Sequence, residues 1–226
     1  MTARLMPKTR FANTRFAALT LAGLVAATPA LAHHAMGGQL PSTFAQGLLS
    51  GLAHPVIGLD HLAALVGVGL VSSRFARGLT LPAFWIVAMA AGIGLHLASA
   101  DLPHAELLVA LSVVVIGIAA TVRATLPYAA IAALFAIGGA VHGYALGESI
   151  VGAESTPLVA YLAGLVVVQT ALTTGIAFAA RRFAKGSLQG PLQAPFQAPS
   201  LRLRLAGLAV ALAGAATFAL ALTTAA

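Results

Sequence analysis

Long apolar runs separated by short loops constrain this chain more than any other feature. A helix rises about 1.5 Å per residue, so a run of about 20 apolar residues crosses the hydrocarbon core of a bilayer. Only 8% of the 226 residues are charged, against about a quarter in soluble domains. The sequence therefore predicts an all-α polytopic membrane protein with six transmembrane helices. We expect these spans at about 44–71, 79–99, 105–122, 127–146, 157–180 and 205–223.

The first 32 residues have the composition of a secretory signal peptide. Four basic residues precede a short apolar core at 16–27, and Ala30-Leu31-Ala32 has the small-x-small pattern of a cleavage site. We expect cleavage there, which leaves residues 33–226 as a single six-helix membrane domain. The alternative is an uncleaved first helix, but its apolar core is short for a span.

Cleavage would make His33 the first residue, followed by His34. An α-amine beside two imidazoles would suit auxiliary metal capture. The alternative is a disordered polar terminus without chemistry.

The charged residues predict the orientation of the spans. With six spans, the basic residues of the loops fall on one side, and Asp101, Glu148 and Glu154 fall on the other. By the positive-inside rule the basic side is cytoplasmic, so both mature termini lie outside the cytoplasmic (inner) membrane of a bacterium. The net charge of +7 is therefore explained by topology, and no nucleic-acid partner is expected. The Gly-, Gln- and Pro-rich stretch 186–200 is predicted to be a flexible cytoplasmic linker before the last helix.

The first mature span carries His54, Pro55, Gly58, Asp60 and His61. Ionisable groups at membrane depth are costly and usually functional. The two histidines are seven residues apart, so they share one face of a continuous helix. Pro and Gly weaken the helix, and we expect a kink at Pro55, with a shallow helix before it and a spanning helix after it. Two imidazoles, a carboxylate and freed carbonyls in one cavity would suit a divalent cation.

The fourth span carries His142, beside a smooth face made by Gly139, Gly143 and Gly147. Such a face allows another helix to approach closely, and the first span is a candidate partner. For a single histidine the simplest explanation is a buried ring bonded to a carbonyl of a neighbouring helix. For the whole set we predict a shared metal site in the outer half of the membrane. It comprises His54, Asp60, His61 and His142, with His96 and Glu148 as further candidates, whereas His104 is expected in a solvated loop.

The available donor types restrict the metal. The chain has no cysteine, which excludes thiolate sites, and imidazole with carboxylate suits nickel, cobalt, zinc and copper. No P-loop is present, so ATP does not drive a process within this chain.

At these motifs the sequence resembles the HupE/UreJ family. The resemblance rests on His54-Pro55-x-x-Gly58-x-Asp60-His61 and on His142-Gly143-x-Ala145-x-Gly147. The second motif has Val141 where the family usually has Phe, and Glu148 directly follows Gly147 where one residue usually intervenes. The resemblance implies nickel or cobalt uptake linked to hydrogenase, urease or other metalloenzyme maturation.

These observations favour a secondary transporter or facilitator, with Ni²⁺ or Co²⁺ as transported substrate and no permanently bound cofactor. Its partners would be the lipid bilayer and the metal ion. One alternative is an intramembrane zinc hydrolase, in which His54, His61 and His142 hold zinc and Asp60 or Glu148 activates water. The other is an accessory structural membrane protein.

Overall fold

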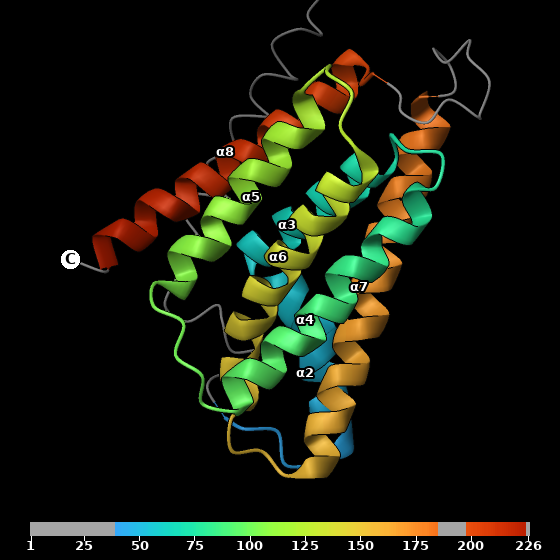
Figure 1. Cartoon of the computed structure of the whole chain (residues 1–226). Coiled ribbons are helices and arrows are strands. Elements are labelled where there is room, and N and C mark those ends of the chain that lie inside the picture. The colour runs from blue at the N-terminus through green and yellow to red at the C-terminus, as the bar shows by residue number, and fades with distance from the viewer. Residues whose placement is uncertain (1–38, 185–197, 225–226) are drawn as a thin grey trace, which may run out of the picture. The chain divides into compact units, whose positions relative to one another are not determined.

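The computed structural model describes residues 39–184 and 198–224 (Figure 1). These residues form seven α-helices and two short 3₁₀-helices, which confirms the predicted all-α class for this part of the chain. The predicted signal peptide, His33, His34 and most of the predicted linker lie outside the described residues. The helices are α2 (Phe44–Ile57), α3 (Leu59–Ser72), η2 (Gly78–Thr80), α4 (Leu81–Leu97), α5 (Ala105–Thr121), α6 (Tyr128–Gly147), η3 (Glu148–Ile150), α7 (Ser155–Ala184) and α8 (Leu201–Thr224).

Helix length and hydropathy show a multi-pass membrane protein. In the described residues, four helical stretches are long and apolar enough to cross a membrane: Gly78–Leu97, Tyr128–Ile150, Ser155–Arg182 and Leu201–Thr223. The pair α2 and α3 makes a fifth if it counts as one broken span. With 17 residues, α5 would measure about 25 Å, less than the usual hydrocarbon core. The count of six spans therefore stays a prediction.

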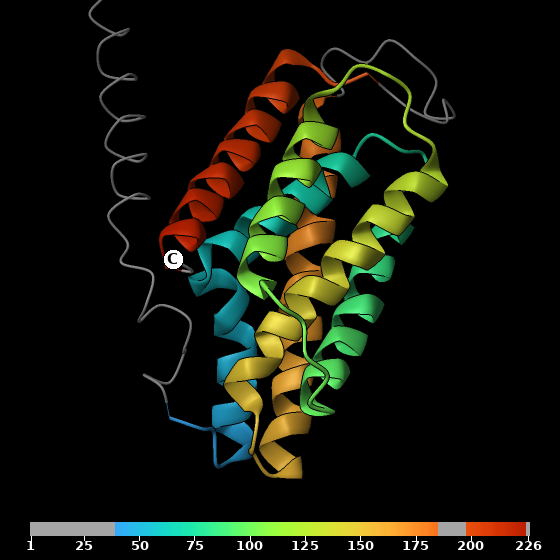
Figure 2. The ribbon, with the colours of Figure 1, turned by 60° about the vertical axis from the view of Figure 1, so that its left-hand side comes forward.

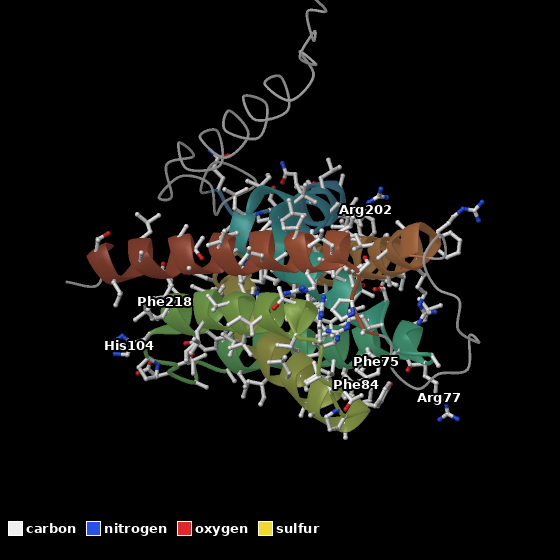
Figure 3. The ribbon with its side chains drawn as sticks, turned by 90° about the horizontal axis from the view of Figure 1, so that it is seen from above. Phe75, Arg77, Phe84, His104, Arg202 and Phe218 are labelled. Atoms are coloured by element: carbon white, nitrogen blue, oxygen red, sulfur yellow. The ribbon has the colours of Figure 1, made fainter. Side chains whose placement is uncertain are left out.

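The helices pack as three close pairs around α3. α4 runs along α6, α5 along α8, and α2 along α7, while α3 contacts α5, α7 and α8 (Figures 1 and 2). Ala64, Leu65 and Val68 of α3 are at most 1% exposed and form part of the main apolar core. Figure 3 shows His104 at one end of the helices and Arg77 and Arg202 at the other. Arg77 and Arg202, two of the basic residues between predicted spans, therefore lie at the same end of the described helices.

The glycine face of α6 packs on α4. A methyl group at Gly143 would overlap the main chain of Met89, and one at Gly139 would overlap that of Trp85. The suggestion that the first span covers this face was therefore wrong. The first span uses its own glycines elsewhere, because Gly47 and Gly51 of α2 lie against the main chain of α7. Small residues at these contacts let the helix backbones approach closely.

Replacing Gly143 with alanine is expected to destabilise the protein by about 1–3 kcal/mol, because the methyl group would push α4 from α6. Gly94→Ala is the matched control, since Gly94 of α4 has open space around it. Thermal unfolding in detergent, followed by the fluorescence of Trp85, the single tryptophan, would measure both variants. Equal melting temperatures would contradict this packing argument.

The chain bends by 77° between α2 and α3. The bend lies at Gly58, which has φ −70° and ψ 107°, whereas Pro55 lies inside α2. The expected kink at Pro55 was therefore misplaced by three residues. A proline removes one donor from the ladder, but the amide of Gly58 still donates to His54 O at 3.0 Å and closes the last turn of α2. The extended ψ at Gly58 then separates the two helices.

At the other end of α3, Arg74 connects the C-terminal end of this helix to the C-terminal end of α5. Its Nη1 donates to Ala119 O at 2.6 Å and its Nη2 to Val122 O at 2.7 Å. These carbonyls belong to the last turn of α5 and lack helical partners. Burial lowers the pKa of Arg74 to about 10. The guanidinium therefore remains protonated at neutral pH and keeps both hydrogen bonds.

Candidate metal site

The centre of the candidate site is a contact between two buried histidines from helices far apart in sequence. His61 stands in the first turn of α3, and His142 near the end of α6. Their Nδ1 atoms are 2.7 Å apart, and their ring centroids 4.9 Å. His61 is 4% exposed and His142 is fully buried. The structure thus brings together the two sequence motifs.

The 2.7 Å separation is that of a hydrogen bond. Two imidazole nitrogens on one metal ion at about 2.0–2.1 Å would be about 2.9 Å apart at a right angle and about 3.3 Å apart in a tetrahedron. The two Nδ1 atoms would have to separate slightly before both could bind the same ion. The pair as it stands therefore shares a proton.

His54 lies beside this pair but makes its contacts with α7 and η3. Its ring centroid is 5.8 Å from that of His61. Its Nδ1 is 3.2 Å from both Ser149 Oγ and Tyr161 Oη. Tyr161 Oη in turn donates to Leu146 O at 2.8 Å. His54 therefore contacts two hydroxyl groups that also form hydrogen bonds to the carbonyl oxygen of Leu146, at the end of α6.

Asp60 lies at the start of α3, where the helix dipole stabilises a negative charge. Its Oδ1 accepts a hydrogen bond from the backbone N–H of His61 at 2.8 Å. Gly58 lies close in space to the side chains of Asp60 and His61. A Cβ there would lie 2.9 Å from His61 Cδ2 and 3.3 Å from Asp60 Oδ1. The absence of a side chain at position 58 therefore keeps space between the carboxylate and the ring edge of His61.

A narrow pocket adjoins the histidine pair and is too tight to hold a water molecule. Trp85 Nε1 donates to Gln169 Oε1 at 2.8 Å, and this contact orients the amide. Gln169 Nε2 is buried and has no hydrogen-bond partner in the described part of the chain. The lining residues are Pro55, His61, Leu65, Trp85, His142, Leu146 and Gln169.

The remaining candidates do not join the pair. The ring of His96 packs on Tyr144, with centroids 4.4 Å apart. Tyr144 follows His142 by two residues and so lies about 200° around α6 from it. Glu148 and His104 are exposed, the latter as expected. Within residues 39–184 and 198–224, no three His, Asp or Glu side chains converge closely enough to hold one metal ion. The four-residue metal site therefore stays a prediction.

Several polar residues of this region were not predicted from the sequence to belong to the site. They are Ser112, Ser149, Tyr161, Gln169 and Trp85. Gln169 and Ser112 are polar residues within predicted spans. Like the histidines, such residues are candidates for a functional site. Gln169, however, contacts Trp85 across 84 residues of sequence, and Ser112 contacts His142 across 30. Spacing along one helix cannot show such contacts.

Apolar helices of membrane-spanning length around buried histidines define a multi-pass membrane protein with a polar centre. The chain belongs to the HupE / UreJ protein family, whose model matches residues 20–218. It is similar to Protein HupE of Rhizobium leguminosarum bv. viciae, with 32% identity over 200 residues, 87% of this chain and 94% of that relative. No solved structure matches the chain.

Proposed function

We propose that the protein takes up a divalent transition metal, nickel or cobalt, across the cytoplasmic membrane as a secondary transporter or facilitator. The observation that carries this proposal is the buried contact of His61 with His142, next to the carboxylate of Asp60 and the helix break at Gly58. Buried imidazoles in a membrane protein suit metals of this class. Membership of the HupE / UreJ family supports the same function.

The broken helix places the last carbonyl oxygens of α2 near Asp60, whose carboxylate offsets the positive dipole end of α3 at the same break. The end of α2 points its last carbonyls and the negative end of its dipole at the break. Broken helices with such ends form the ion sites of many secondary transporters. A few ligands beside a bend also allow release, which transport requires as much as binding. The proposed substrate would therefore meet His61, Asp60 and carbonyl oxygens at one point of the path, with His54 and His142 alongside.

Uptake of radiolabelled nickel and cobalt by cells with and without the protein tests this function. Accumulation that depends on the protein is expected for at least one of the two metals. Equal accumulation in both kinds of cell, at verified protein levels, would reject transport and favour an accessory role.

A zinc hydrolase would need three protein ligands and an open position, whereas the described donors meet only as a pair.

The proposed orientation places Arg123 in the cytoplasm and Glu154 outside. We expect an impermeant thiol reagent added to intact cells to label Glu154→Cys and to leave Arg123→Cys unlabelled until the cells are opened. Both side chains are exposed, and the chain has no native cysteine to interfere. The reverse pattern of labelling would invert the proposed topology.

A further inference from the structure

Gln169 of α7 is a buried amide with a partner at one end only. Its side chain is 1% exposed. The indole N–H of Trp85 can only donate, so the atom that it meets at 2.8 Å is the carbonyl oxygen Oε1. The amino group Nε2 is therefore buried, and no group in residues 39–184 or 198–224 accepts a hydrogen bond from it. A single hydrogen bond thus holds this amide in its orientation.

Gln169 lies further along α7 than the contact of this helix with His54. Tyr161 makes that contact, and Gln169 follows it by about 12 Å of helix in the direction of Arg181. In the proposed orientation this direction leads to the cytoplasm. Gln169 lines the same narrow pocket as His61 and His142. The amide is therefore the first polar side chain of α7 on the inward side of the histidine pair.

The next buried polar side chains in this direction belong to α7 and α3. Thr173 and Ser72 are both fully buried. Thr173 is one helical turn beyond Gln169, and Ser72 lies within about 20° of the face of α3 that carries His61. The Thr173 hydroxyl donates to Gln169 O at 2.7 Å, so it can meet a further group only through its lone pairs. Ser72 Oγ has no hydrogen-bond partner in the described part of the chain.

This inward route is closed in the structure. The pocket beside Gln169 is too tight to hold a water molecule. Further in, α3 lies against α7, because a methyl group at Gly69 would come within 2.9 Å of Thr173 O. At the inner end, Arg181 donates to the carbonyl oxygens of Ser73 and Phe75, just after α3. An ion can pass only if α7 moves relative to α3.

We propose that the metal leaves the histidine pair inward along the contact of α3 with α7, and that Gln169 is the first group that it meets there. This inference rests on the proposed function and extends it to the exit of the metal. Once the bond to Trp85 breaks, Gln169 Oε1 can face the ion, and a carbonyl oxygen is a metal ligand. Only one hydrogen bond opposes this rotation, which suits a path that opens and closes. Thr173 and Ser72 offer hydroxyl oxygens further in.

Cysteine labelling in inside-out membrane vesicles tests this route without a transport measurement. The probe is Thr173→Cys, exposed to a small charged thiol reagent from the cytoplasmic side. Ala120→Cys is the buried control, since Ala120 is equally buried but lies where α5 meets α8. Gly175→Cys is the lipid-facing control, since Gly175 is exposed with open space around it, and a thiol in apolar surroundings reacts slowly.

We expect Thr173→Cys to react roughly tenfold faster than either control, because only this position lies on a route that opens. Trp85→Phe removes the hydrogen bond to Gln169 and should accelerate labelling of Thr173→Cys about tenfold. It should leave both controls unchanged. Labelling of Thr173→Cys no faster than that of Ala120→Cys would overturn the proposal, and this comparison needs no change at Trp85.

Uptake kinetics test the role of Gln169 itself. Gln169→Leu has a similar size without the amide, and it should lower the maximal rate of nickel or cobalt uptake about tenfold. The metal concentration for half-maximal uptake should stay within about twofold, because the histidine pair is unchanged. An unchanged maximal rate would remove Gln169 from the path.

Failure of the route and failure of the proposed function give different results. Metal uptake by cells in which Thr173→Cys labels no faster than the controls would reject the route alone. Fast labelling of Thr173→Cys without uptake of either metal would reject the proposed function, because the labelling needs no metal.

Discussion

Replacement of His61 with alanine is expected to abolish metal uptake, to the level of cells that lack the protein. The substitution removes the imidazole that faces the helix break and leaves His142 Nδ1 without its 2.7 Å partner. A buried polar atom left without a partner costs about 1–3 kcal/mol, so some loss of stability is expected as well. Uptake of radiolabelled nickel and cobalt, normalised to the amount of protein in the membrane, would measure the effect.

His104→Asn is the control for this experiment. His104 is exposed and has φ 58°, a left-handed conformation that asparagine tolerates better than alanine. Its uptake should equal that of the native protein. Normal accumulation by the His61→Ala variant at native protein levels would show that the histidine pair is structural, and the transport mechanism proposed above would then be wrong.

A methyl group at Gly58 is expected to reduce uptake severely while the protein still folds. The backbone angles of Gly58, φ −70° and ψ 107°, are accessible to alanine, so the main chain can keep its bend. The new Cβ would lie only 2.9 Å from His61 Cδ2 and 3.3 Å from Asp60 Oδ1. It would therefore displace the ring and occupy the space where the cation is proposed to bind. We expect at least a tenfold loss of uptake, since a small misplacement of binding groups has effects of this size or larger.

Gly94→Ala again serves as the control, because its added methyl group meets no atom within 4 Å. The two variants make the same chemical change, and only the one at position 58 touches the candidate site. Comparable uptake by both variants would place the metal path away from the break at Gly58. Melting temperatures measured in parallel would separate loss of the site from loss of the fold.

The sequence alone predicted the helices closely. The fourth expected span, 127–146, corresponds to α6 at Tyr128–Gly147, and the third, 105–122, to α5 at Ala105–Thr121. This accuracy has a physical reason, because the bilayer requires apolar side chains and internally bonded backbone over the whole span. The sequence also predicted which loops share a side, since loops with basic residues alternate with loops with acidic residues along the chain.

The location of the bend was harder to predict than its existence. Pro55 and Gly58 both weaken a helix, and the sequence does not rank them. The structure shows that α2 tolerates the proline, whereas a side chain at position 58 would crowd His61 and Asp60. That crowding depends on the fold of the first turn of α3, which no spacing rule describes.

The sequence by itself thus determined that the chain is a helical membrane protein, where its helices run and which motifs carry the histidines. Only the tertiary structure decided which helices meet, and with them the contacts of the site. It paired α6 with α4, brought His142 of α6 to His61 of α3, and placed Ser112 of α5 against His142. Lipid is as apolar as the helix surfaces, so the hydrophobic effect does not select helix partners within a membrane. Close packing of small residues and a few buried hydrogen bonds make that choice, and both depend on complementary shapes that a hydropathy pattern does not contain.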